Sequence, residues 1–174
     1  MKKIFFFDRD GVINEDIGYC HKIDDFEFIE NSISIMKYII SSGFEIIIVT
    51  NQSGIGRGLY SEEDFHILNN WMKKELLVRG IELLDVLYCP HTPDNNCSCR
   101  KPKPGLIIAA CKKYNIDCKN SWLIGDKERD IISGIKSEIN NTVLFENSKD
   151  RNIKTKARFT IHSLNEIKNL GIDK

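Results

Sequence analysis

Residues 3–12 read KIFFFDRDGV, an apolar run that ends at Asp8 and is followed closely by Asp10 and Gly11. A short continuous apolar run is typical of a strand in a parallel sheet, because helices cover both faces of such a sheet. Ligands of these sheets bind beyond the carboxyl ends of the strands. Asp8 and Asp10 are therefore the first candidates for a functional site.

Apolar segments alternate with segments of helical periodicity along the rest of the chain. Residues 32–42 carry apolar side chains at helical spacing before Gly43, and Ser61 precedes three acidic residues, as a helix N-cap does. We expect strands at 3–7, 45–50, 84–88, 121–124, 142–145 and 158–161, and helices at 32–42, 62–79, 104–115, 127–136 and 163–169. This alternation predicts an α/β fold of the Rossmann-like, three-layer kind: a parallel sheet with helices on both faces.

The length and charge balance exclude several classes of protein. The chain has 174 residues, of which 41% are hydrophobic and 29% charged, with 25 basic against 25 acidic residues. We expect one domain over residues 1–174, because a chain of this length buries roughly 70% of its unfolded surface. Zero net charge and short apolar runs give no sign of a nucleic-acid partner, a membrane span or a secretory signal. We therefore expect a cytoplasmic monomer that binds neither nucleic acid nor membrane.

Six cysteines need an explanation, because stable disulfides are uncommon in the cytoplasm. Cys89, Cys97 and Cys99 lie with His91 inside eleven residues. Three thiolates and an imidazole form a common closed zinc site, so we predict a zinc-binding loop at residues 89–99. The alternatives are a loop of unligated thiols and a zinc-finger module, for which the spacing is too tight. The remaining cysteines are expected to be unpaired, partly buried thiols: Cys20, Cys111 and Cys118.

Two carboxylates at one strand end suit phosphate chemistry. An aspartate nucleophile forms an aspartyl-phosphate and divides one difficult hydrolysis into two easier steps, while a second carboxylate handles protons. The transition state carries charge on the phosphoryl oxygens, which Mg²⁺ and a fixed cation neutralise. Asp126, at the end of a later strand, offers a further hard oxygen ligand for Mg²⁺. On this pair alone, Asp8 and Asp10 could also simply cap the following turn.

Four ordered motifs resemble those of the haloacid dehalogenase superfamily of phosphatases, in its histidinol-phosphatase-like branch. They are Asp8-x-Asp10-Gly-Val, Thr50-Asn51-Gln52-Ser53-Gly54, Arg100-Lys101-Pro102 and Gly125-Asp126-Lys127-x-x-Asp130. The resemblance extends over residues 3–145 and implies a haloacid-dehalogenase-like fold. Only about 35 residues separate the first motif from the second strand, so we expect no large cap domain. It also implies a small sugar phosphate as substrate, with hydrolysis of the C7 phosphate of a heptose 1,7-bisphosphate as the favoured reaction.

The resemblance implies a role for each matched residue. Asp8 is the expected nucleophile, Asp10 the general acid and then base, and Thr50 and Lys101 the groups that stabilise the transferring phosphoryl group. Mg²⁺ is expected on the Asp8 carboxylate, the Asp10 backbone carbonyl and Asp126, with a structural Zn²⁺ in the cysteine loop. The expected substrate contacts are Asp16, Gly18, Tyr19, Asn51, Gln52, Ser53, Arg57, Arg100 and Lys127. Asp130 is expected to orient Lys127 or a metal-bound water, and residues 54–58 to form a flexible loop that carries Arg57.

Three other functions are compatible with parts of the sequence. Histidinol-phosphate phosphatases share the same motifs and the zinc loop. Polynucleotide 3′-phosphatases share the D-x-D-G and T-N-Q patterns, but the balanced charge and the lack of a kinase domain weigh against this function. A non-catalytic metal-binding scaffold of the same fold has no need of Asp8, Asp10, Lys101 and Asp126 together.

Overall fold

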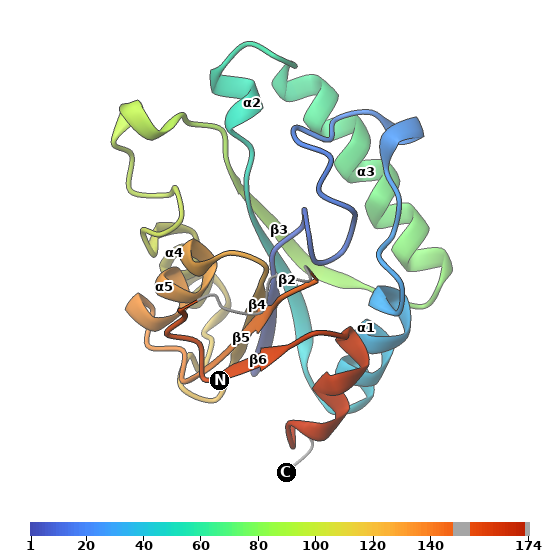
Figure 1. Ribbon diagram of the computed structural model, residues 1–174, viewed down its shortest axis with the longest axis vertical. Helices are drawn as coiled ribbons and strands as arrows, with labels where there is room; N and C mark the ends of the chain where they lie inside the picture. Colours follow the sequence, from blue (N-terminus) through green and yellow to red (C-terminus); the bar gives the residue numbers. More distant parts are fainter. Residues whose placement is uncertain (148–153, 173–174) are drawn as a thin grey trace.

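A six-stranded parallel sheet forms the centre of the computed structural model, which describes residues 1–147 and 154–172 (Figure 1). The strands are β1 (Ile4–Phe7), β2 (Glu45–Asn51), β3 (Leu83–Cys89), β4 (Trp122–Gly125), β5 (Asn141–Phe145) and β6 (Phe159–Ile161). Their order is β3-β2-β1-β4-β5-β6, and every neighbouring pair is parallel. The order reverses between β1 and β4, so the switch point lies where the first motif ends its strand. The expected domain also includes 148–153 and 173–174, which lie outside the described residues.

Helices lie on both faces of this sheet. They are α1 (Ser32–Ser41), α2 (Ser53–Gly56), α3 (Glu62–Val78), α4 (Gly105–Tyr114) and α5 (Glu128–Lys136), with short 3₁₀ helices η1 (Ile23–Asp25), η2 (Pro93–Asn95) and η3 (Leu164–Asn169). Ser61 caps α3 as expected: its hydroxyl accepts a hydrogen bond from Asp64 N, and the Asp64 carboxylate accepts one from Ser61 N. Within the described residues, no helix combines the length and the apolar character needed to cross a membrane.

The pleat of β1 divides the core between two layers. Phe5 and Phe7 belong to the cluster that contains the apolar side chains of α1, α3 and η3. Ile4 and Phe6 belong to the cluster on the other face, with α4 and α5. Figure 1 shows these two groups of helices on opposite sides of the sheet. The three-layer α/β architecture predicted from the sequence is confirmed.

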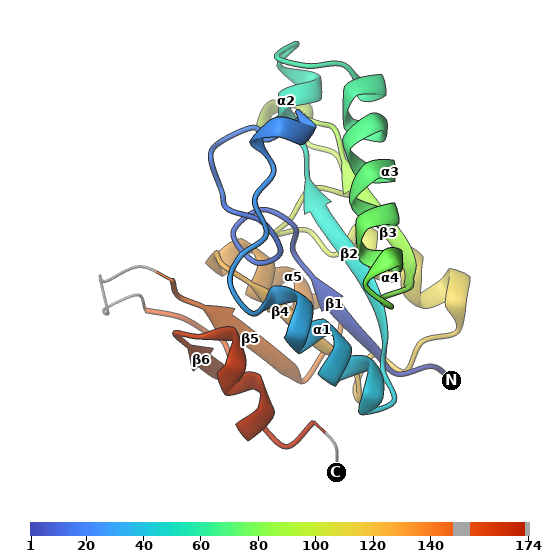
Figure 2. The same cartoon turned by 90° about the vertical axis from the view of Figure 1, so that its right-hand side faces the viewer.

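No large cap domain interrupts the described chain, as the sequence predicts. Between β1 and α1 the chain forms a loop whose helical part is η1, and between β2 and α4 it forms α2, α3, β3 and the loop that contains η2. Figure 2 shows η1 and α2 at the same end of the molecule, beyond the carboxyl end of β2. The site at this end is therefore bordered by loops and one short helix.

The structure differs from the sequence prediction at three places. The last helix, expected at 163–169, is the 3₁₀ helix η3 rather than an α-helix. The glycine-rich segment expected as a flexible loop begins with the helical turn α2. Cys111 and Cys118 form a disulfide instead of two unpaired thiols. The chain reverses at Asn115, whose left-handed backbone ends α4, and this brings the two Cα atoms to 6.8 Å.

Truncation of an apolar residue in the layer between β2 and α4 tests this architecture. Ile47 is fully buried, so Ile47→Ala should lower the free energy of unfolding by about 2–5 kcal/mol through lost burial and a cavity. The matched control is Ile67→Ala, because Ile67 on α3 is 55% exposed and its loss should cost less than about 0.5 kcal/mol. Chemical denaturation measures both, and equal effects would contradict the assigned core.

Candidate active site

Four polar segments meet at the carboxyl edge of the sheet. Asp8 follows β1, Thr50 lies at the end of β2, Lys101 follows the loop after β3, and Asp126 follows β4. Asp8 N donates to the Ile124 carbonyl at 3.0 Å, so the β1–β4 ladder continues up to the nucleophile candidate. The parallel sheet thus brings together residues that lie more than a hundred positions apart in the chain.

The Lys101 side chain is the centre of this edge. Its ammonium Nζ lies 2.9 Å from Asp8 Oδ1 and 2.7 Å from Asp130 Oδ1, and it donates to the Val49 carbonyl at 2.8 Å. The side chains of Lys101, Asp8 and Asp130 are 2%, 6% and 1% exposed. A buried ammonium is tolerated only when its donors are satisfied, and here all three find acceptors.

Burial and charge shift the ionisation of this group in opposite ways. Burial raises the pKa of Asp8 to about 7, with repulsion from Asp130 adding to the effect and Lys101 opposing it. Burial alone would lower the pKa of Lys101, but attraction from Asp130 and Asp8 raises it above its usual value. Lys101 is therefore a permanent cation at the edge, whereas Asp8 is a carboxylate whose ionised form needs further positive charge.

Asn51 holds the backbone of Lys101 in place. Its amide Nδ2 donates to the Lys101 carbonyl at 3.1 Å, and its Oδ1 accepts from Lys101 N at 3.1 Å. The family resemblance assigns Asn51 to the substrate, and the residue does line the cavity of about 330 Å³ described below. The nitrogen and the oxygen of its side-chain amide nevertheless both bond to the Lys101 backbone. The main contacts of Asn51 therefore position the cation.

Two glycines permit close approach of the motifs. Gly11 has a φ of +85°, and a Cβ atom built there would overlap the Asp126 carboxylate. A Cβ atom at Gly125 would overlap the Asp130 side chain. The loop after β1 can therefore lie against Asp126, and α5 against β4, only because both positions lack a side chain.

The acidic residues of this edge can hold a hard metal ion. Carboxylate oxygens of Asp8, Asp126 and Asp130 all lie within 4.8 Å of one another. Asp126 Oδ1 is buried without a hydrogen-bond partner among the described residues, and burial raises the pKa of Asp126. A cation ligated by oxygen would satisfy this orphaned atom and favour the ionised form, so the donor set fits Mg²⁺.

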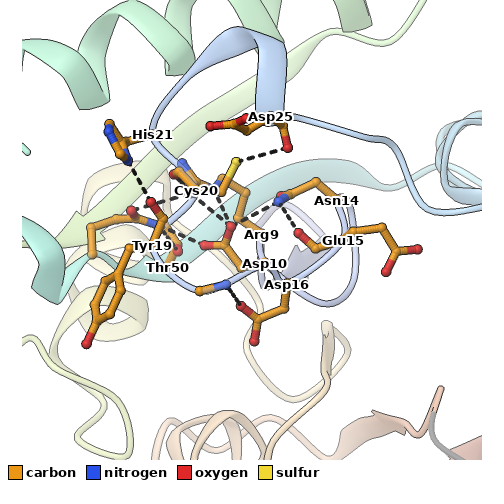
Figure 3. A network of polar contacts seen from close by, with 12 residues as sticks. Arg9, Asp10, Asn14, Glu15, Asp16, Tyr19, Cys20, His21, Asp25 and Thr50 are labelled. Atoms are coloured by element: carbon orange, nitrogen blue, oxygen red, sulfur yellow. Dashed lines mark hydrogen bonds and ion pairs between the residues drawn. The ribbon is translucent and has the colours of Figure 1, made fainter.

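The two carboxylate oxygens of Asp10 accept different numbers of hydrogen bonds (Figure 3). Its Oδ1 accepts from Arg9 Nε at 3.2 Å, Arg9 Nη2 at 2.9 Å and Asn14 Nδ2 at 3.0 Å. Its Oδ2 accepts from Gln52 Nε2 at 3.0 Å. Arg9 is itself buried, and its Nη2 also donates to the Cys20 carbonyl at 2.7 Å. Oδ1 is thus saturated, and Oδ2 is the oxygen available for proton transfer.

Gln52 links the second motif to this acid. Its Nε2 donates to Thr50 Oγ1 at 2.8 Å as well as to Asp10, and its Oε1 accepts from Tyr60 Oη at 2.6 Å. The ring of His21 stacks on Tyr60 with centroids 4.8 Å apart. Sequence reasoning missed Arg9 and Tyr60. The sequence feature that could have identified Arg9 is its position between two carboxylates at the end of a buried strand.

A cavity of about 330 Å³ opens beside Asp10. All the expected substrate contacts except Lys127 line it: Asp16, Gly18, Tyr19, Asn51, Gln52, Ser53, Arg57 and Arg100. Tyr60 and Arg129 line it as well, and neither is among the site residues expected from the sequence. Lys127 instead lines a neighbouring cavity of about 320 Å³ and pairs with Asp126 Oδ2 at 2.7 Å. Asp130 accepts from Lys127 N at 3.1 Å, so it orients the Lys127 backbone, as expected, and also Lys101.

The cysteine loop brings its four expected ligands together. Cys89 Sγ lies 3.0 Å from Cys99 Sγ and 3.6 Å from Cys97 Sγ, and His91 Nδ1 lies 3.3 Å from Cys99 Sγ. All four ligand atoms lie within 4.8 Å of one another. Burial disfavours the Cys97 thiolate, but hydrogen bonds from Cys99 and Arg100 N outweigh it and lower the pKa of Cys97 to about 6. Three soft sulfur donors and an imidazole fit Zn²⁺.

Known proteins resemble this chain along almost its full length. The family model described as "Polynucleotide kinase 3 phosphatase" matches residues 3–161. The chain is 48% identical over 144 residues, 79% of each chain, to a D-glycero-alpha-D-manno-heptose-1,7-bisphosphate 7-phosphatase of Photorhabdus laumondii. It is 41% identical over 178 residues to a D-glycero-beta-D-manno-heptose-1,7-bisphosphate 7-phosphatase of Pasteurella multocida. This alignment covers 98% of this chain and 97% of the relative.

Solved structures share the fold. A D,D-heptose 1.7-bisphosphate phosphatase from B. bronchiseptica, complexed with magnesium and phosphate, has a TM-score of 0.86 at 24% identity over 96% of both chains. A HAD phosphatase from Thermococcus onnurineus has a TM-score of 0.67 at 15% identity, covering 98% of this chain and 97% of that chain. The resemblance inferred from the four motifs is confirmed. This chain belongs to the polynucleotide kinase 3 phosphatase family, and its relatives of 41–48% identity are D-glycero-D-manno-heptose-1,7-bisphosphate 7-phosphatases.

Proposed function

We propose that this protein is a Mg²⁺-dependent phosphatase that removes the C7 phosphate of D-glycero-D-manno-heptose 1,7-bisphosphate and leaves heptose 1-phosphate. The observation that carries the proposal is the Asp8 carboxylate held by Lys101 beside Asp126, next to a cavity lined by arginines. The names of the relatives support the substrate, and they include both the alpha and the beta anomer. The product would enter the synthesis of nucleotide-activated heptose for cell-surface polysaccharide.

Asp8 acts as the nucleophile. Its Oδ1 accepts from Arg9 N at 2.8 Å and pairs with Lys101 at 2.9 Å, whereas its Oδ2 has no hydrogen-bond donor in the described parts of the chain. Oδ2 therefore attacks phosphorus and the bond to the sugar oxygen breaks, which gives an aspartyl-phosphate. Water then attacks this intermediate, releases inorganic phosphate and restores the carboxylate.

Asp10 moves the proton in both steps. Because Arg9 and Asn14 saturate Oδ1, the proton resides on Oδ2, from which it passes to the leaving sugar oxygen. The same oxygen then accepts a proton from the attacking water. Gln52 orients Oδ2 and also Thr50, whose hydroxyl donates to the transferring phosphoryl group.

Lys101 neutralises charge that develops on the phosphoryl oxygens. It is fixed before substrate binds, so it costs no reorganisation during the reaction. Asp8, Asp126 and the Asp10 carbonyl would hold Mg²⁺, which when bound supplies further positive charge at the phosphoryl group. The pKa of Asp8 is raised, and the nucleophile must be ionised to react. A bound metal ion would favour the ionised form of Asp8.

Zinc in the cysteine loop would be structural. Four protein ligands, Cys89, His91, Cys97 and Cys99, would fill its coordination shell and leave no position for water. The loop continues directly into Arg100, whose Nη1 donates to the His91 carbonyl at 3.2 Å. Fixing the loop therefore fixes Arg100 and the start of the Lys101 segment.

We further propose that residues 1–174 form one domain that works as a cytoplasmic monomer without nucleic acid or membrane.

A phosphate-release panel with Mg²⁺ tests the proposed function. Heptose 1,7-bisphosphate should give a higher kcat/KM than histidinol phosphate or fructose 1,6-bisphosphate. Asp8→Asn should lower kcat by at least about 10⁴-fold, because an amide matches the carboxylate in shape but cannot attack phosphorus. Asp24→Asn is the control, since Asp24 is an exposed carboxylate on η1. If Asp8→Asn retains more than about 1% of wild-type kcat, the nucleophile is another group.

The dependence of stability on Mg²⁺ should itself depend on pH. The pKa of Asp8 rises from 3.8 to about 7 on folding, so its protonated form stabilises the metal-free fold fully below about pH 4, and this contribution is lost as the pH rises through 7. Mg²⁺ binds the ionised form, so it should raise Tm more at about pH 8 than at about pH 6. Differential scanning fluorimetry measures this. Asp8→Asn should lose most of the difference, and an equal Mg²⁺ effect at both pH values would refute the assignment.

Removal of one zinc ligand should impair substrate recognition without changing the magnesium site. Cys99→Ser should lower the zinc content from about one ion per chain and reduce kcat/KM by about 100-fold, because Arg100 loses its fixed position. The Mg²⁺ concentration for half-maximal activity should stay unchanged. Asp94→Asn, an exposed position of the same loop, keeps all four ligands and serves as the control. Full activity in protein shown by metal analysis to lack zinc would exclude this role.

A further inference from the structure

The cation expected at the start of α5 lines a different cavity from the other expected substrate contacts. Lys127 is the α5 N-cap residue and lines the neighbouring cavity with Glu15 and Asp16. Its Nζ pairs with Asp126 Oδ2 at 2.7 Å and lies 4.0 Å from Asp16 Oδ2. The hydrogen bond that its ammonium donates to Asp126 and the attraction of both carboxylates raise the pKa of Lys127. Lys127 is thus committed to the acidic side of the site.

Arg129, two residues further on, lines the cavity in which Lys127 was expected. It lies in the first turn of α5 and lines the substrate cavity of about 330 Å³. Its side chain is exposed and forms no ion pair with any other described residue. The two cations are close enough for Arg129 to oppose the rise in the pKa of Lys127. Arg129 is therefore a charged group at the cavity wall with its hydrogen-bonding capacity unused by the described chain.

Two more guanidinium groups line the same cavity. Arg57 is the C-cap residue of α2, and Arg100 follows the cysteine loop, so the three arginines come from three separate segments. Neither Arg57 nor Arg100 pairs with a carboxylate of the described residues. The carboxylates that line the cavity are Asp10 and Asp16. Arg9 already pairs with Asp10, and Lys127 lies 4.0 Å from Asp16.

The cavity therefore carries an excess of positive charge away from the nucleophile. Lys101, which faces the transferring phosphoryl group, is buried between Asp8 and Asp130 and does not line this cavity. Unpaired arginines on a cavity wall attract a dianion, and the planar fork of each guanidinium matches two phosphate oxygens. A second phosphate on the same substrate is the group that this arrangement recognises.

We propose that Arg129 binds the phosphate that is not hydrolysed, together with Arg57 and Arg100. The inference rests on the proposed function, since it assigns the far end of the substrate of that reaction. Arg129 then takes the substrate contact that the family resemblance implied for Lys127. The enzyme then selects a bisphosphate over a monophosphate through a residue on α5, beside the helix turn that carries Asp130.

Binding to an inactive background tests this inference without turnover. In Asp8→Asn protein with Mg²⁺, calorimetry compares heptose 1,7-bisphosphate with heptose 7-phosphate, which lacks the second phosphate. Adding Arg129→Gln should weaken binding of the bisphosphate about 10-fold, and that of the monophosphate much less. Arg129→Lys should fall between, because it keeps the charge and loses the fork. The control is Lys136→Gln, which removes an exposed charge from the other end of α5.

Each outcome bears on one of the two proposals. An unchanged bisphosphate affinity in Arg129→Gln, or an equal loss for both ligands, would overturn the role of Arg129. The same loss in Lys136→Gln would also overturn it, because the effect would then be one of net charge alone. Failure of the wild-type protein to release phosphate from the bisphosphate would instead overturn the proposed function, whatever the affinities are.

Discussion

The rest of the site depends on the ion pairs that the buried Lys101 ammonium forms with Asp8 and Asp130. It binds Asp8 after β1, the Val49 carbonyl on β2 and Asp130 on α5, so one side chain joins three elements at the carboxyl edge. Removing any partner of a buried charge is strongly destabilising, because the remaining charge is left uncompensated. Asn51 and the cysteine loop then fix the backbone on either side of this lysine. The Asp8 carboxylate, the Lys101 ammonium and the start of α5 are therefore positioned as one unit.

Most of the fold could be predicted from local sequence patterns. The short apolar runs identify strands that are buried on both faces, and the Ser61 capping box identifies the start of α3. The site could be located in the same way, because parallel strands deliver their carboxyl ends to one edge and the four motifs sit at those ends. Gly11 and Gly125 supply the space that this convergence needs.

The remaining features depend on tertiary geometry that a linear pattern does not contain. Lys127 and Arg129 are two positions apart, and only the direction of each side chain from the first turn of α5 decides which cavity it enters. The burial of Arg9 follows from the path of the loop that returns Cys20 over the strand end. The Cys111–Cys118 disulfide follows from a chain reversal after α4.

A crystal structure with Mg²⁺ and beryllium fluoride tests the central claim most directly, since this fluoride mimics a phosphoryl group on an aspartate. We expect beryllium bonded to Asp8 Oδ2, and Lys101 Nζ within about 3 Å of a fluoride while it still contacts Asp130. Such a complex would show that the pre-formed pair of Asp8 and Lys101 is the phosphoryl-transfer site. Beryllium fluoride bound elsewhere, or a Lys101 side chain withdrawn from Asp8 and the fluorides, would contradict it.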